Sequence, residues 1–247
     1  MRIDFIGVGF PRSGSTWLTY CLSEHPEISI PKFNLLTEIN YFPEEYEVMG
    51  LKNYIVKFLN CDFEKKVGEL STLIILEKRS AKLLKKLFPN IKIIIYKRNE
   101  DERAESDFIV KKNFDLYDVK LQDLKLNQEY LIKPWIKEFG KSNLFIFDLD
   151  SKNQKKELQN LYKFLEVNPD FIPPSFDREK GPYAKSFKHN TAWKDKKNKI
   201  PKTSKLGKFR KVINKIKDFS RKNKKIYYFM KRNMCLDFYY QWLSRRL

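Results

Sequence analysis

The feature that most constrains the fold lies at the start of the chain, where a strand-like run, a glycine-containing turn and a helix-like run follow one another. Residues 3–8 form an apolar stretch that predicts a buried strand, and residues 16–22 repeat apolar side chains at helical spacing. In such a unit, backbone N–H groups and the positive end of the helix dipole converge on one point. The turn at residues 9–15 therefore predicts an anion-binding loop in an α/β protein.

Side chains of the turn fit the same purpose. Arg12 offers a forked, permanently charged donor that suits phosphate-like groups. Gly9 and Gly14 have the spacing of a P-loop, but Ser15 stands where a P-loop carries its lysine. The most apolar later strand ends in Lys97, where a P-loop enzyme needs an acidic magnesium ligand. A kinase-like P-loop phosphotransferase therefore stays an alternative, although the chain lacks both the P-loop lysine and the acidic magnesium ligand of that class.

Two segments resemble the sulfotransferases that use 3′-phosphoadenylyl sulfate (PAPS). Residues 11–17 (Pro-Arg-Ser-Gly-Ser-Thr-Trp) resemble the loop that binds the 5′-phosphosulfate in that family. Arg98 at the end of a strand and Ser106 eight residues later resemble its 3′-phosphate site. Glu100 stands where the family commonly has proline. The resemblance covers roughly residues 1–192. Within the family, the chain is similar to the glycosaminoglycan-type and bacterial members.

The resemblance implies PAPS as the donor substrate, adenosine 3′,5′-bisphosphate (PAP) as the product and no metal. The residues that it implies for donor binding are Arg12, Ser13, Gly14, Ser15, Thr16, Trp17, Arg98, Ser106, Lys185 and Lys188. Arg12 is also expected to act on the reacting group.

The expected general base is Glu38. Cytosolic members of the family use a histidine between the two phosphate motifs, but residues 26–188 contain no histidine. Glu38 opens the segment Glu-Ile-Asn-Tyr-Phe, which resembles the Glu-x-x-Phe/Tyr-Phe segment whose glutamate is the base in the glycosaminoglycan-type class. A lysine usually precedes that glutamate, and this chain has Thr37. Gly-Glu-Leu-Ser at residues 68–71 resembles another family segment, in which Glu69 is expected to be structural, with acceptor contact as the alternative.

Strand-like and helix-like segments alternate along the chain. Periodicity predicts strands at 3–8, 91–96 and 144–147, and helices at 15–24, 51–60, 80–88, 100–112, 128–139 and 154–165; residues 70–76 fit either strand or turn. This order predicts an α/β fold with a P-loop-like, mainly parallel sheet flanked by helices. Ligands of such sheets bind at the carboxyl ends of the strands, where both anion motifs are expected.

The positive charge is concentrated near the C-terminus. The chain carries a net charge of +19, and residues 194–232 contain 17 Lys or Arg against two Asp. We expect a sulfotransferase domain at residues 1–192 and a basic helical extension at residues 193–247. Apolar side chains at helical spacing in residues 209–219 fit an anionic membrane surface or, equally, a helix packed on the body. Charge thus leaves a third interpretation, a non-catalytic basic module that binds anionic polymers or membranes.

The sequence indicates less about the cellular compartment of the protein and about its acceptor substrate. Three widely separated cysteines fit free thiols, and no apolar run reaches transmembrane length. We expect a cytoplasmic enzyme, peripheral at a membrane if the basic extension binds one, with no specific nucleic-acid partner. The expected acceptor is a hydroxyl or amine of a carbohydrate or glycolipid.

Overall fold

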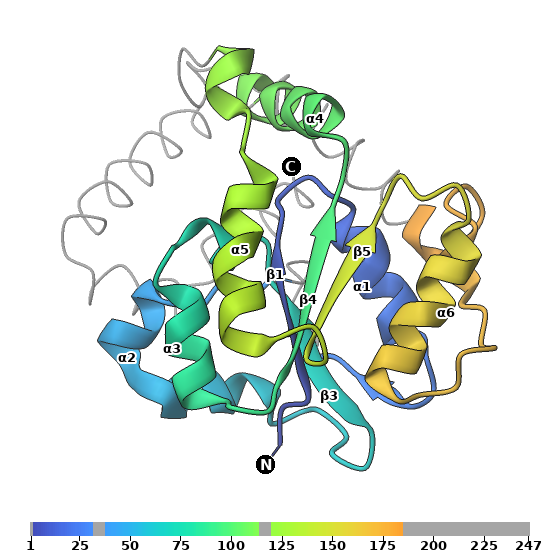
Figure 1. The fold of residues 1–247 in the computed structure, drawn as a ribbon. Coiled ribbons are helices and arrows are strands. Elements are labelled where there is room, and N and C mark those ends of the chain that lie inside the picture. Colours follow the sequence, from blue (N-terminus) through green and yellow to red (C-terminus); the bar gives the residue numbers. More distant parts are fainter. Residues whose placement is uncertain (1, 32–37, 114–119, 185–247) are drawn as a thin grey trace, which may run out of the picture.

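The core of the molecule is a parallel sheet of five strands in the order β2-β3-β1-β4-β5. The computed structural model describes residues 2–31, 38–113 and 120–184 (Figure 1). The strands are β1 (Phe5–Gly9), β2 (Ile28–Ser29), β3 (Lys66–Leu70), β4 (Lys92–Lys97) and β5 (Leu144–Asp148). The chain extends the sheet from β1 to one side and then returns to the other side with β4. This reversal creates a topological switch point beside β1, where ligands of such sheets bind.

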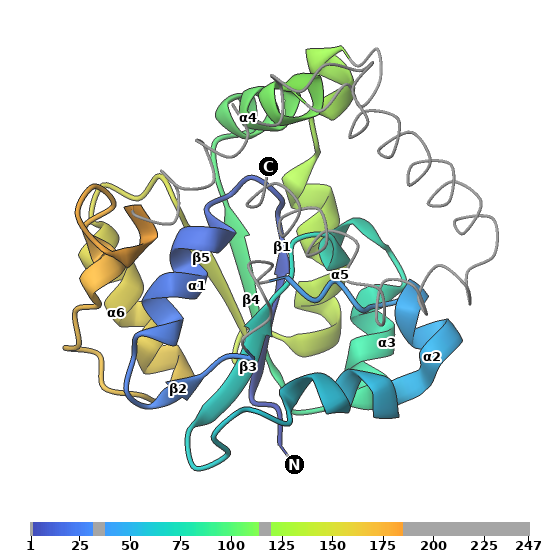
Figure 2. The ribbon, with the colours of Figure 1, turned by 180° about the vertical axis from the view of Figure 1, so that it is seen from behind.

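Helices cover both faces of the sheet, and Figures 1 and 2 show the two layers from opposite sides. One layer holds α1 and α6, the other holds α2, α3 and α5, and α4 lies beyond the carboxyl end of β4. The helices are α1 (Ser15–Ser23), α2 (Glu44–Ile55), α3 (Ser80–Leu87), α4 (Glu100–Asn113), α5 (Gln128–Phe139) and α6 (Gln154–Leu165). Short 3₁₀ turns are η1 (Val56–Phe58), η2 (Ile74–Leu76), η3 (Leu121–Leu124) and η4 (Pro174–Phe176).

Side-chain alternation along the strands explains the two layers. In β4, Ile93 and Ile95 pack with α2, α3 and α5, whereas Ile94 and Tyr96 pack with α1 and α6. Successive strand residues point to opposite faces, so a strand that is apolar throughout must be covered twice. The predicted α/β fold with a parallel sheet flanked by helices is therefore confirmed.

Some local predictions were wrong. The expected helix at 51–60 begins earlier, as α2 at Glu44, and is interrupted at Gly50, whose φ of 71° and ψ of 173° are not helical. The apolar run at 70–76, for which strand and turn were both left open, begins with the last residue of β3 and contains the 3₁₀ turn η2. The two-residue strand β2 was not expected. The predicted basic extension lies outside the described residues. Within the described ranges, none of the helices combines the length and apolar character needed to cross a bilayer.

Candidate functional site

The anion loop connects β1 to α1 and is held by backbone contacts. Phe10 N donates to Tyr96 O of β4 at 2.7 Å, so the loop begins pinned to the neighbouring strand. Gly14 adopts a left-handed conformation, with φ 78°, and its carbonyl accepts the first helical bond of α1, from Leu18 N at 3.0 Å. The left-handed conformation favours glycine here, and a Cβ at Gly14 would also displace the end of the Leu149 side chain, whose Cδ1 would lie 2.7 Å away. The N-terminus of α1 thus points into the loop without a side chain on its cap residue.

The polar side chains of the loop differ in their exposure. Ser13 is buried, and its Oγ has no hydrogen-bond partner among the described residues. Arg12 and Thr16 are exposed. A buried hydroxyl without a partner is unusual, because such groups are nearly always paired. The Ser13 hydroxyl is therefore left without a partner within the described part of the chain, and its role in binding an anion stays a prediction.

Trp17 is placed differently from the other loop residues. Its indole is buried in the core between the sheet and α6, and Nε1 donates to Ser175 O at 2.8 Å. The guanidinium carbon of Arg178 lies 4.2 Å from the ring centroid. Trp17 can therefore offer the loop its backbone N–H, while its side chain anchors α1.

The second anion motif begins where β4 ends. Arg98 follows β4, and its Nη2 lies 2.5 Å from Oε2 of Glu102, so the arginine is held by an acid one turn into α4. Asn99 Oδ1 accepts from the N–H of Asp101 at 3.0 Å and caps the start of α4. Ser106 lies on the same helix, two turns from its start.

Glu100 replaces the proline that the family commonly has here, and the structure gives it a role. Its carboxylate accepts from the buried Arg103 (Nη2 to Oε1, 2.6 Å), from Gln128 Nε2 at 2.6 Å and from Leu126 N at 2.7 Å. Burial acts to raise the pKa of Glu100, but these hydrogen bonds outweigh it and the pKa is lowered. Glu100 thus fixes α4 to the start of α5.

The two anion motifs touch each other. Nε and Nη2 of Arg12 both donate to Ser106 Oγ, each at 3.1 Å. These residues are 94 positions apart in the sequence and come from the loop after β1 and from α4. The structure therefore brings together two motifs that the sequence could only place at the same edge of the sheet.

Glu38 lies against the same loop. Its Oε1 accepts from Ser15 Oγ, the first residue of α1, at 3.1 Å. Its Oε2 accepts from Thr72 Oγ1 at 2.6 Å and from Asn40 Nδ2 at 3.2 Å. Three donors from three segments orient the carboxylate beside the N-terminus of α1. Asn40 and Thr72 were not predicted; the pair Ser71-Thr72 at the carboxyl end of β3 is the signal that could have indicated them.

A buried carboxyl supports the segment that carries Glu38. Glu69 is fully buried and accepts from Ser71 Oγ at 2.6 Å and from Tyr54 OH at 3.2 Å. Ser71 Oγ in turn accepts from Asn40 N at 2.8 Å. Burial raises the pKa of Glu69 to about 7, and the negative charge of Glu38 adds to the effect, while the bonds from Ser71 and Tyr54 oppose it. Burial agrees with the structural role expected for Glu69.

Two predicted residues lie outside the description: Lys185 and Lys188 both fall beyond residue 184. Among the described residues, no group of three or more His, Cys, Asp or Glu side chains could hold a metal ion.

Comparison with known proteins places the chain in a family. A sequence model described as "Sulfotransferase domain" matches residues 2–233. The match extends past residue 192, and the expected division of the chain at that point stays a prediction. A search of curated proteins gave no match.

Three solved structures are similar to this chain. A sulfotransferase from Alicyclobacillus acidocaldarius shares 21% identity with a TM-score of 0.59, covering 79% of this chain and 92% of its own. The sulfotransferase domain from the curacin biosynthetic pathway shares 18% identity with a TM-score of 0.52, covering 75% and 83%. The sulfotransferase domain from the Synechococcus PCC 7002 olefin synthase shares 15% identity with a TM-score of 0.51, covering 83% and 90%. These likenesses support the fold. With a family match over nearly its whole length, the chain belongs to the sulfotransferase domain family.

Proposed function

We propose that this sulfotransferase moves a sulfuryl group from PAPS to a hydroxyl or amine of a carbohydrate-like acceptor, with Glu38 as the general base. One observation carries the proposal: the loop after β1 contacts both Ser106 and Glu38, at 3.1 Å in each case. A donor held at two anion sites would then present its reacting end to the carboxylate.

The donor would be held at both ends. PAPS supplies an activated sulfuryl group on its 5′-phosphate. The backbone N–H groups at the start of α1, the hydroxyls of residues 13, 15 and 16 and the guanidinium of Arg12 would bind that end. Arg98 and Ser106 would bind the 3′-phosphate, and Lys185 and Lys188 are proposed to assist them. The unpartnered hydroxyl of Ser13 and the left-handed Gly14 before the N-terminus of α1 support this fit.

Glu38 would take the proton of the acceptor. Its carboxylate accepts three hydrogen bonds, which fix its direction and leave a lone pair for a fourth donor. As the acceptor oxygen or nitrogen forms its bond to sulfur, its proton passes to Glu38 and the bond from sulfur to the phosphate oxygen breaks. Arg12 and the N-terminus of α1 would stabilise the charge that develops on the departing phosphate.

The alternatives have less support. A P-loop phosphotransferase needs a lysine where this chain has Ser15, and the family match favours sulfuryl transfer. A basic module without catalysis would not need a carboxylate oriented by three donors beside an anion loop. A carbohydrate or glycolipid acceptor, a cytoplasmic location and contact of residues 193–247 with anionic membranes remain proposals.

Replacement of Glu38 tests the base directly. Glu38→Gln should lower turnover with labelled PAPS by about 10²- to 10⁴-fold, because a positioned base contributes that much, and leave PAP binding unchanged. The matched control is Glu77→Gln, which removes an exposed carboxylate after η2 and should retain full turnover. A Glu38→Gln enzyme as fast as wild type would eliminate Glu38 as the base.

A further inference from the structure

Asn40 lies two residues after Glu38, at a turn whose neighbouring side chains are fixed in the core. Ile39 and Tyr41 are buried and pack on the face of the sheet that α2, α3 and α5 cover. Asn40 itself is half-buried and has a left-handed φ of 45°. Asparagine and aspartate adopt this conformation more readily than most other residues with a side chain. Aspartate can therefore replace Asn40 without a change of backbone conformation.

The hydrogen bonds of Asn40 fix the orientation of its side-chain amide. Oδ1 accepts from the N–H groups of Thr72 and Leu73, each at 3.0 Å, just beyond the end of β3. Because both of these neighbours are donors, the amide oxygen must face them and the NH₂ group must face away. On that side Nδ2 donates to Glu38 Oε2 at 3.2 Å. Asn40 thus joins the carboxylate of Glu38 to the backbone that follows β3.

Thr72 closes these bonds into a ring of three residues. Its N–H donates to Asn40 Oδ1, and its Oγ1 donates to Glu38 Oε2 at 2.6 Å. Each of the three residues is therefore hydrogen-bonded to the other two. Such a ring restricts all three side chains, because none of them can rotate away without breaking its bonds to both partners.

Buried groups of β3 and its carboxyl end anchor the ring. Asn40 N donates to Ser71 Oγ at 2.8 Å, and Ser71 Oγ donates to the fully buried Glu69 at 2.6 Å. Burial raises the pKa of Glu69 and of Tyr96 on β4, and the negative charge of Glu38 raises both pKa values further. The neutral amide of Asn40 therefore holds Glu38 without adding a charge to this group of ionisable side chains.

The two carboxylate oxygens of Glu38 differ in their capacity for another hydrogen bond. Each oxygen of a carboxylate has two lone-pair sites. Asn40 and Thr72 fill both sites of Oε2. Oε1 accepts one bond from the described residues, from Ser15 Oγ at the start of α1, at 3.1 Å. Oε1 is therefore the oxygen on the side of the anion loop, and it has room for a further donor.

We propose that Asn40 is a positioning residue for sulfuryl transfer: together with Thr72 it fills Oε2 of Glu38, so that Oε1 is the oxygen that takes the proton of the acceptor. This inference rests on the proposed function, in which Glu38 is the base, and adds which oxygen reacts and what holds it. As the acceptor atom bonds to sulfur and the bond from sulfur to the phosphate oxygen breaks, the acceptor's proton passes to Oε1. Oε2 keeps both of its hydrogen bonds throughout.

Asn40→Asp tests the proposal, because it keeps the turn and an oxygen for the two backbone N–H groups but replaces the donor to Oε2 by a second carboxylate. Cleavage of labelled PAPS, with water or added glucosamine as the acceptor, should slow by about ten- to hundredfold, the effect of a small misplacement of a reacting group. The dissociation constant of PAP should stay as in wild type. The acid limb of the pH profile of kcat should move up by about one pH unit, because a neighbouring negative charge favours the protonated form of a carboxyl group.

Thr72 gives a neutral test that does not depend on the folding of the Asn40→Asp variant. Thr72→Val removes the other donor to Oε2 and keeps the shape of the side chain, so kcat should fall by about threefold or more. Thr72→Ser keeps the hydroxyl and should turn over close to wild type. Both variants should bind PAP as wild type does.

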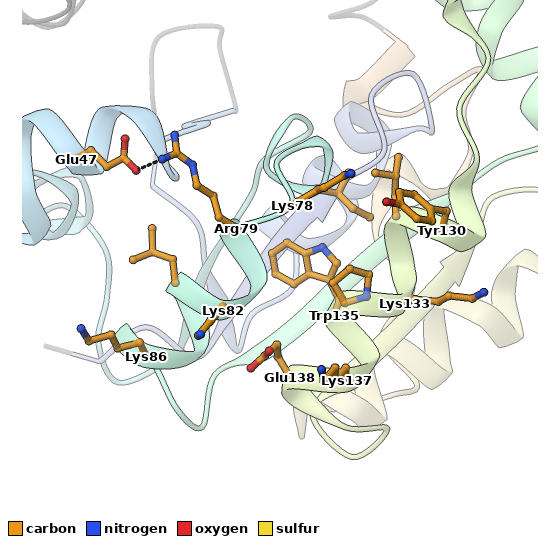
Figure 3. A pocket seen from close by; sticks show the side chains of 14 residues that line it. Glu47, Lys78, Arg79, Lys82, Lys86, Tyr130, Lys133, Trp135, Lys137 and Glu138 are labelled. Carbon is orange, nitrogen blue, oxygen red and sulfur yellow. Dashed lines mark ion pairs between the residues drawn. The ribbon is translucent and has the colours of Figure 1, made fainter.

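Two controls separate the position of Asn40 from a general change in charge. Asn168→Asp makes the same exchange at an exposed asparagine whose Oδ1 accepts from Asp170 N at 3.0 Å. Asn168 O lies 2.9 Å from Nε2 of His25, which follows the end of α1 opposite to the anion loop. Lys133→Gln, in the basic groove between α3 and α5 (Figure 3), lowers the net charge by the same single unit. Both controls should keep the turnover and the pH profile of wild type.

Three results would overturn the inference: wild-type turnover and pH profile in Asn40→Asp and Thr72→Val, a loss of turnover matched by an equal loss of PAP affinity, or an equal loss in the two controls. Glu38→Gln, assayed alongside, separates this inference from the proposed function. If Glu38→Gln cleaves PAPS as fast as wild type, the proposed function loses its base. If Glu38→Gln is slow while Asn40→Asp and Thr72→Val match wild type, the role of Asn40 alone is wrong.

Discussion

Arg98, the proposed ligand of the 3′-phosphate, is held by an acidic residue of its own chain. The side chains of Arg98 and Glu102 are 28% and 55% exposed, and their ion pair occupies the guanidinium that the 3′-phosphate would need. A phosphate must therefore compete with a carboxylate for the same donors. Glu102→Gln should raise the affinity for PAP by about two- to fivefold, the amount expected for release of an exposed ion pair.

Glu105→Gln provides the matched control for this prediction. Glu105 is exposed on the same helix. Its replacement by glutamine removes one negative charge near Ser106, as Glu102→Gln does, but leaves the ion pair of Arg98 in place. Calorimetric titration of both variants with PAP separates competition for Arg98 from a general change in charge. A gain in affinity that is equal in the two variants would refute the competition.

The residues of the site could be predicted only in part. Arg12, Ser106 and Glu38 were expected from motif resemblance, and the structure brings all three to the loop after β1. The bonds from Asn40 and Thr72 to Glu38 depend on how the segment after residue 37 crosses the end of β3. The Thr72 bond joins residues 34 positions apart, so the pair Ser71-Thr72 could indicate hydroxyl donors at this edge of the sheet but not that Glu38 receives a bond from one of them.

At the scale of elements, the end of β3 is stabilised by a proton. Glu69, with a pKa near 7 against an ordinary value of 4.5, binds its proton more tightly in the folded than in the unfolded state. Its contribution to stability is therefore complete below pH 4.5 and is lost as the pH rises to about 7. Relative to Glu69→Gln, wild type should lose about 3 kcal/mol of unfolding free energy over this range.

Denaturant unfolding of both proteins at a series of pH values measures that difference. Glu166→Gln serves as the contrast, because bonds from Lys66 and Lys92 lower the pKa of Glu166 to about 2. A lowered pKa contributes stability above the ordinary value and loses it as the pH falls toward 2, so this variant should differ from wild type by a constant amount between pH 5 and 8. A constant difference for Glu69→Gln as well would contradict the buried proton.

Elements were predicted best where a single signal dominated. The apolar run that ends at Tyr96 predicted a strand at 91–96, and β4 spans Lys92–Lys97 with Ile93 to Tyr96 buried. Helix α2 was placed too late, because Gly50 interrupts it and only the apolar part after the interruption was recognised. Strand β2 has two residues, too few for any alternation to be visible. Its pairing with β3 comes from the fold and not from its own sequence.

At the scale of the whole molecule, most of the net charge lies outside the described residues. Residues 194–232 carry about +15 of the +19. If this segment is a separate basic extension, a chain ended after Trp193 should keep its affinity for PAP and lose binding to phosphatidylserine vesicles. Vesicle binding of the full chain should fall steeply with salt, because exposed charges are screened within about 8–10 Å.

The family match extends to residue 233, so the shortened chain also tests whether residues 194–233 belong to the fold. If residues 194–233 complete the fold, the shortened chain will be insoluble or will unfold at lower denaturant concentration than the full chain. Circular dichroism and a PAP titration on the shortened chain distinguish the two cases. Failure to fold would contradict the division of the chain into residues 1–192 and 193–247.

We propose that one donor nucleotide is bound at both ends, by the loop after β1 and by Arg98 with Ser106. Calorimetric titration with PAP in the absence of magnesium, compared with Mg-ATP, tests it most directly. We predict tight PAP binding by wild type that weakens about tenfold or more in Arg98→Ala and several-fold in Ser106→Ala. Arg79→Ala, which removes another ion-paired arginine, should bind PAP as wild type does. Preference for Mg-ATP, or a dissociation constant for PAP that neither substitution changes, would contradict the account.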